Sequence, residues 1–141
     1  MDDNSAIAGL FGVLANARMR LSEFRKNLEA SNTFREVSFS IEFRKYERSV
    51  DERFKTVLEV YIEAYLANKR DEGDCLVWWL DVTCDGSQWV LEPSVTWDGV
   101  EQILKLKNRM VATDEKFLQE LPLVLEELIG TYNQVTKKVG F

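Results

Sequence analysis

Carboxylates are the side chains best suited to chemistry in this sequence, because the chain contains no histidine. Without histidine there is no Ser-His-Asp or Cys-His nucleophile pair and no His-containing zinc site. Glu59 and Glu63 are spaced to share one face of an expected strand, where paired carboxylates serve as acid and base in glycosidases. Asp81 is a third candidate for such chemistry. No pocket-forming loop or glycine-rich segment accompanies these acids, so the sequence favours a protein that is not an enzyme.

Neither the cysteines nor the acidic turn predicts a disulfide, a metal or a cofactor. Cys75 and Cys84 are nine positions apart in one expected strand, so roughly 30 Å separates them at about 3.3 Å per residue, too far for a disulfide bond. Lone thiols are typical of the reducing cytoplasm. The segment DEGD at 71–74 lacks the twelve-residue spacing and the terminal Glu of a calcium-binding loop. We therefore expect no metal site and no cofactor.

Negative charge is concentrated in residues 71–99. The chain has a net charge of −6, and this window holds seven acids without a single Lys or Arg. All four tryptophans and both cysteines lie in the same window. The next segment supplies three cations, Lys105, Lys107 and Arg109, which we expect on one side of a fifth strand. Nucleic acid is a poor candidate partner, because phosphate contacts need a clustered positive field.

Trp78 and Trp79 are consecutive in an expected strand, so their side chains point to opposite faces of the sheet. With Trp78 in the core, Trp79 shares the outer face with Val77, Arg44, Tyr46 and the acids and tyrosines of neighbouring strands. Aromatic anchors ringed by charge are typical of protein-binding surfaces, although cross-strand pairs in an ordinary exposed sheet have the same composition. The expected partner-binding residues are Trp79, Asp81, Tyr61, Tyr65, Glu59, Glu63, Glu42, Asp85 and Glu92.

Alternating apolar residues predict the strands that position these side chains. Residues 37–43 alternate apolar and polar side chains, which predicts a half-buried antiparallel strand. Residues 54–68 alternate as well, and their aromatic and β-branched content favours a strand over a helix. Residues 100–110 are either a fifth strand or a helix. The inward-facing residues expected on the third and fourth strands are Leu76, Trp78, Leu80, Val82, Trp89, Leu91, Val95 and Trp97.

Turn signals separate these strands. Asp85-Gly86 and Asp98-Gly99 supply the positive φ angles that tight hairpins need, so they predict two hairpins. Pro93 has no backbone N–H to donate, which predicts that the fourth strand is an edge strand or carries a bulge.

Two apolar stripes at helical spacing predict a helix at each end of the chain. Ser5 is the expected N-cap of the first and Thr113 that of the second, and Pro122 predicts that the second is kinked or split there. The start of the chain is acidic and its apolar run stops near Ala15, so we expect neither an export signal nor a membrane span. The stripes consist of Ile7, Leu10, Leu14, Ala17, Leu21, Phe24 and Leu28, and of Leu118, Leu121, Leu125, Leu128, Tyr132 and Val135.

Together these signals predict one α+β domain spanning residues 1–141. It has two layers: an antiparallel meander of four to five strands, and the two helices on one face of that sheet. The sequence favours a small acidic cytoplasmic module that binds a basic protein and no membrane. Immunity proteins that neutralise toxins and secretion chaperones share this physical character, although no motif identifies either family. The alternatives are a structural homodimer formed through the helix stripes and a carboxylate enzyme that works without histidine.

Overall fold

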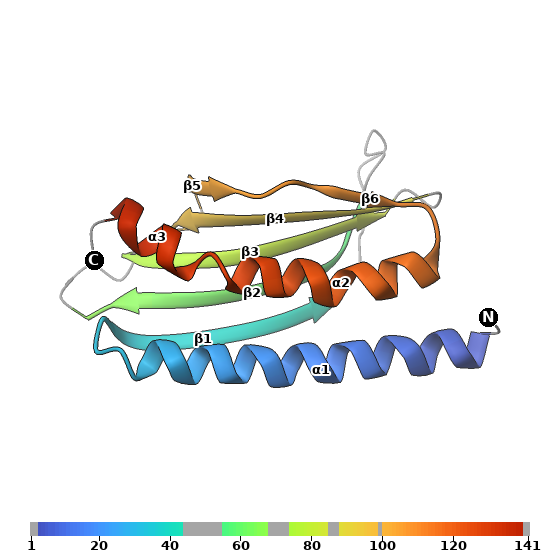
Figure 1. Cartoon of the computed structure of the whole chain (residues 1–141), viewed down its shortest axis with the longest axis horizontal. Helices are drawn as coiled ribbons and strands as arrows, with labels where there is room; N and C mark the ends of the chain where they lie inside the picture. Colours follow the sequence, from blue (N-terminus) through green and yellow to red (C-terminus); the bar gives the residue numbers. More distant parts are fainter. Residues whose placement is uncertain (1–2, 44–54, 68–73, 85–87, 99, 140–141) are drawn as a thin grey trace.

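The computed structural model describes residues 3–43, 55–67, 74–84, 88–98 and 100–139. It is an α+β structure, as predicted, with an N-terminal helix, an antiparallel sheet and a bent C-terminal helical segment (Figure 1). The sheet has six strands, whereas four to five were predicted. The elements in chain order are α1 (Asp3–Glu29), β1 (Phe34–Phe43), β2 (Lys55–Leu66), β3 (Cys75–Cys84), β4 (Trp89–Trp97), β5 (Glu101–Lys105), β6 (Arg109–Val111), α2 (Asp114–Ile129) and α3 (Tyr132–Val139).

The sheet is the predicted meander, with strand order β1-β2-β3-β4-β5 and β6 also paired with β4. Residues 54–68 therefore contain a strand and not a helix. Residues 100–110 contain two short strands, β5 and β6, which pair with successive parts of β4. A hairpin turn at the predicted position is supported by the positive φ of 56° at Asp98 and by the Val100 N–H, which donates to the Trp97 carbonyl at 3.0 Å, although Gly99 itself lies outside the described residues. The Asp85-Gly86 turn lies outside the described residues.

The helices cover one face of the sheet and bury its apolar side chains (Figure 1). Trp78 is fully buried there, with the ring of Phe24 from α1 edge-on at 5.4 Å between centroids. The Trp78 Nε1–H donates to the hydroxyl of Thr131 at 3.2 Å. The predicted inward residues of β3 are all fully buried: Leu76, Trp78, Leu80 and Val82.

Helix α1 begins at Asp3, so the prediction that Ser5 is its N-cap was wrong. Residues 2–5 are Asp, Asp, Asn and Ser, all favoured at helix starts, so residue type alone did not fix the position. The predicted stripe is buried at Ala17, Leu21, Phe24 and Leu28, whereas Leu10 and Leu14 are half-buried. Among the described residues, no helix has the length and apolar character that crossing a bilayer requires.

The C-terminal segment is bent, but its break lies at Gly130–Thr131 and not at Pro122. Helix α2 runs from Asp114 through Pro122 to Ile129, and Thr113 is its N-cap, accepting the Lys116 N–H at 3.1 Å. Both the backbone N–H and the hydroxyl of Thr131 donate to the Leu128 carbonyl, at 3.2 Å and 2.7 Å. These bonds satisfy a carbonyl at the end of α2 and separate it from α3.

Candidate binding face of the sheet

The outer face of the sheet, opposite the helices, carries its side chains in rows set by strand register. Glu42 pairs with Glu59, Glu59 with Asp81, and Asp81 with Glu92. We call these four carboxylates, one from each of β1 to β4, the acidic row. The next row along the strands consists of Ser40, Tyr61, Trp79, Ser94 and Lys105, and the one after it of Ser38, Glu63, Val77, Thr96 and Gln102.

The acidic row brings like charges into directly opposite positions. Side chains in such positions have Cβ atoms about 5 Å apart, and like charges there lower stability. Glu42 accepts hydrogen bonds from the Tyr61 hydroxyl at 2.8 Å and from Ser40 at 3.3 Å. The bond to Glu42 is the main reason that the pKa of Tyr61 is raised above its ordinary value. Among the described residues, no three acidic or thiol groups are arranged to hold a metal ion.

Tyr65 is held on the outer face by charged neighbours, farther along the strands from the acidic row. Its hydroxyl donates to Glu63 at 3.1 Å, and the Arg35 guanidinium lies 5.0 Å from the centre of its ring. Burial first and the bond to Glu63 second raise the pKa of Tyr65. These contacts fix the aromatic ring, so little side-chain freedom remains for a partner to restrict.

Trp78 and Trp79 diverge as the strand geometry predicts. Trp78 is fully buried under the helices, whereas Trp79 is half-buried on the outer face, opposite Tyr61 on one side and Ser94 on the other. The outer face is not uniformly wet, since Val77, Thr83, Val90 and Thr96 are all buried.

Pro93 interrupts the sheet next to Trp79. The sequence predicts an edge strand or a bulge here. Strand β4 has neighbours on both sides and is not an edge strand, but its register shift between Val95 and Thr96 agrees with the predicted bulge. The Pro93 carbonyl accepts the Leu106 N–H at 3.3 Å. The N–H and C=O of one residue point to the same side of an antiparallel strand, so proline lacks a donor on the side of this neighbouring segment. Because that donor is missing, the ladder breaks there, and residues 106–108 separate β5 from β6.

A cavity of about 280 Å³ opens on the outer face beside this break. Three of its residues, Trp79, Asp81 and Glu92, belong to the predicted binding surface. The irregularity predicted at Pro93 is the signal in the sequence that points to the others. The cavity is lined by Trp79, Asp81, Glu92, Pro93, Ser94, Thr96, Gln102, Lys105 and Asn108.

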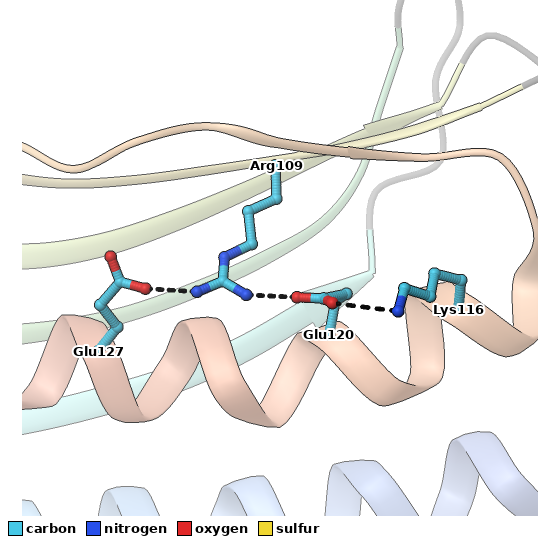
Figure 2. A network of polar contacts seen from close by, with 4 residues as sticks. All are labelled: Arg109, Lys116, Glu120 and Glu127. Carbon is cyan, nitrogen blue, oxygen red and sulfur yellow. Dashed lines mark hydrogen bonds and ion pairs between the residues drawn. The ribbon is translucent and has the colours of Figure 1, made fainter.

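The same break reverses the direction of Arg109, so the prediction that it shares a side with Lys105 and Lys107 was wrong. Figure 2 shows Arg109 reaching from β6 toward α2, where it bonds to Glu120 and also to Glu127 at 2.6 Å. The hydrogen bond that Arg109 donates to Glu120 is the main cause of the raised pKa of Arg109. These bonds fix β6 to α2. Asn108, the residue immediately before β6, lines the outer cavity.

A larger cavity, of about 450 Å³, lies between β5 and α3 and is lined by residues that include Trp97, Glu101 and Lys138. The Lys138 ammonium already donates to the Ile103 carbonyl at 3.2 Å. The outer face is therefore the stronger candidate site.

The structure brings together six of the predicted binding residues: the four of the acidic row, with Tyr61 and Trp79 in the adjoining row. Glu63 and Tyr65 lie farther along the same face, and Tyr61 separates Glu63 from Glu59. Asp85, Arg44 and Tyr46 lie outside the described residues. Comparison of the chain with protein-family models, with curated proteins and with solved structures finds no match.

Proposed function

We propose that this protein is a non-catalytic binding module that engages a basic protein partner through the outer face of its sheet. The observation that carries the proposal is the acidic row, in which Glu42, Glu59, Asp81 and Glu92 align across four strands. Four carboxylates at adjacent strand positions concentrate negative charge on this face. Such a field attracts a cationic partner surface and speeds its association.

The row beside the acidic row supplies the anchors of the proposed interface. Tyr61 and Trp79 are opposite one another and half-buried, so each offers apolar area to a partner without being loose. Tyrosine and tryptophan are enriched among the residues that dominate binding energy, and a charged rim around them is typical of such surfaces. An antitoxin-like or chaperone-like role fits this chemistry. A reducing compartment such as the cytoplasm suits the free thiols of Cys75 and Cys84.

The alternative function, a structural homodimer, draws on the exposed apolar side chains of the helix layer. Phe11 and Met19 of α1 are 67% and 60% exposed, and Leu123 of α2 is 55% exposed. Against this alternative, most of both helix stripes is buried within one chain. Sedimentation at micromolar concentration separates the two functions, since the binding module is expected to be monomeric without its partner.

The proposal is tested by charge reversal on the acidic row with a matched control elsewhere. The test variant is Glu59→Lys with Asp81→Lys, and the control is Glu23→Lys with Glu115→Lys, which changes the net charge equally on exposed positions of the helix layer. Partners captured by the immobilised wild-type chain are purified and titrated against all three proteins between about 50 and 300 mM salt. Circular dichroism and urea unfolding show whether each variant is folded.

We expect the acidic-row variant to bind at least about tenfold more weakly than the control, because it removes the complementary field. Wild-type affinity should fall as salt rises. Equal affinity of the two variants, or an affinity independent of salt, contradicts the proposal.

A further inference from the structure

We propose that the cavity beside Pro93 is a binding site for a carboxamide group, contributed by a small amide-bearing ligand or by an Asn or Gln side chain. The inference stands on the cavity walls and not on the proposed protein-binding function. It therefore holds or fails separately from the role of the acidic row.

Three residues that line this cavity each have a polar atom that is buried without a hydrogen-bond partner among the described residues: Trp79 Nε1, Thr96 Oγ1 and Asn108 Oδ1. Thr96 is only 8% exposed, so its hydroxyl has no ready access to bulk water. Folded proteins pair nearly all their buried polar atoms, and an unpaired one requires an explanation. Three unpaired atoms gathered around one cavity point to a missing occupant that pairs with them.

The types of these atoms restrict the occupant. The indole Nε1–H of Trp79 only donates, the Oδ1 of Asn108 only accepts, and the hydroxyl of Thr96 does either. A carboxylate offers no donor to Asn108, and an ammonium or guanidinium offers no acceptor to Trp79. A carboxamide has a carbonyl oxygen for Trp79 and an NH₂ group for Asn108, with Thr96 free to bond to either end.

Charge at the rim favours the same neutral group. Asp81 and Glu92 are directly opposite each other on one side of the cavity, and both oppose entry of an anion. A cation is attracted to them but leaves the Trp79 donor unpaired. The three polar atoms are shielded from solvent in the ligand-free chain. A carboxamide that enters the cavity therefore displaces the exposed side chains of Gln102 and Lys105, which also line it.

Three planar probes of similar size test the donor and acceptor pattern: acetamide, acetate and guanidinium. Each is titrated into the ¹⁵N-labelled full chain, and the indole N–H signals of the four tryptophans are followed by NMR. A Trp79→Phe variant identifies the Trp79 signal. We expect acetamide to shift that signal saturably, with half-saturation in the millimolar range that so small a ligand allows, and acetate and guanidinium to leave it in place.

A matched pair of variants localises the effect. Thr96→Val removes the unpartnered hydroxyl at nearly constant shape and is expected to weaken acetamide binding at least fivefold. Thr83→Val makes the same change at a residue that is equally buried on the same face but does not line the cavity, and it should leave binding unchanged. Thermal unfolding verifies that both variants are folded.

Two peptides that differ only by Gln or Glu at one position distinguish a side-chain source of the amide from a free one. Tighter binding of the Gln peptide than of acetamide assigns the site to a protein partner, and equal or weaker binding assigns it to a small molecule. The inference is overturned if acetamide does not shift the Trp79 signal, which would mean that only water fills the cavity. It is also overturned if acetate or guanidinium shifts that signal as strongly. The Glu59→Lys and Asp81→Lys variant is not used here, so a failure of the protein-binding proposal leaves this test intact.

Discussion

The two faces of the sheet treat the same residue types in opposite ways. On the inner face, Trp78 is fully buried and its Nε1–H is bonded to the Thr131 hydroxyl at 3.2 Å. On the outer face, Trp79 is half-buried and its Nε1–H is buried without a partner among the described residues. Two consecutive tryptophans thus differ in whether the fold completes their hydrogen bonding. The helices cover the inner face, whereas the outer face has buried polar atoms without a hydrogen-bond partner among the described residues.

The threonines show the same contrast. Thr131 is 5% exposed and Thr96 is 8% exposed, so the two are equally dry. The Thr131 hydroxyl accepts from Trp78 and donates to the Leu128 carbonyl, but the Thr96 hydroxyl has no partner in the described part of the chain. Burial therefore does not distinguish these two threonines, whereas the pairing of their hydroxyl groups does.

The largest expected effect comes from truncating the two tryptophans. Trp78→Ala removes a fully buried indole and should lower the free energy of unfolding by about 3–5 kcal/mol. Trp79→Ala removes a half-buried one and should cost no more than about 2 kcal/mol. Urea unfolding followed by circular dichroism measures both. Equal losses would mean that the outer face belongs to the core and would remove the contrast.

The threonine pair is expected to give effects of opposite sign for one substitution. Thr131→Val leaves the buried Trp78 donor without an acceptor and should lower the free energy of unfolding by about 1–3 kcal/mol. Thr96→Val removes a hydroxyl that lacks a partner and should leave stability unchanged or raise it by about 0.5–1 kcal/mol. The same urea experiment tests both. A loss of stability in Thr96→Val would show that a firmly held water completes the outer cavity in the free protein.

A smaller effect is expected at the ion pairs that join the edge of the sheet to the helix layer (Figure 2). Arg109→Met leaves Glu120, whose side chain is 15% exposed, without its main cation, and should lower the free energy of unfolding by about 1 kcal/mol. Lys116→Met removes a longer contact to Glu120, of 3.7 Å, and should change stability by less than about 0.5 kcal/mol. Equal effects would mean that Arg109 does not anchor β6.

Local sequence patterns predicted the layers of this fold, because each pattern reports which side of one element is dry. The alternation of residues 37–43 and the 3–4 spacing of the helix stripes placed the core on one face of the sheet. The consecutive indoles at 78 and 79 then identified the outer face. None of these inferences needed to know which residues of different strands lie opposite each other.

The candidate site depends on which residues of different strands lie opposite each other. The acidic row exists because register sets Glu42, Glu59, Asp81 and Glu92 opposite one another, and register is a property of pairs of strands that one strand's pattern does not carry. The interruption after Lys105 shifted the alternation, so Arg109 moved to the helix side and Asn108 into the cavity. Thr96 and Asn108 are ordinary polar residues in sequence. Only the folded structure reveals that the Thr96 hydroxyl and the Asn108 Oδ1 have no hydrogen-bond partner in the described part of the chain.

Cys75 tests whether water is excluded from the outer face. It is buried beside Tyr65, and its N–H donates to Asp98 at 2.9 Å. Burial, and next the charge of Asp98, raises the pKa of the Cys75 thiol from 9.0 to about 11. Between these two values the unfolded chain loses this proton while the folded chain keeps it, so the free energy of unfolding should fall as pH rises from 9 to about 11. Below pH 9 the thiol should contribute no pH dependence.

The matched variants Cys75→Val and Cys84→Val separate the contribution of Cys75 from that of other groups. Urea unfolding at a series of pH values should show a shallower fall in Cys75→Val than in the wild-type chain. Cys84→Val retains Cys75 and should keep the steeper fall. If Cys75→Val follows the wild-type curve, solvent reaches the thiol in the folded chain. The end of the outer face near Tyr65 would then be wet, and the dry part of that face would be confined to the rows beside the acidic residues.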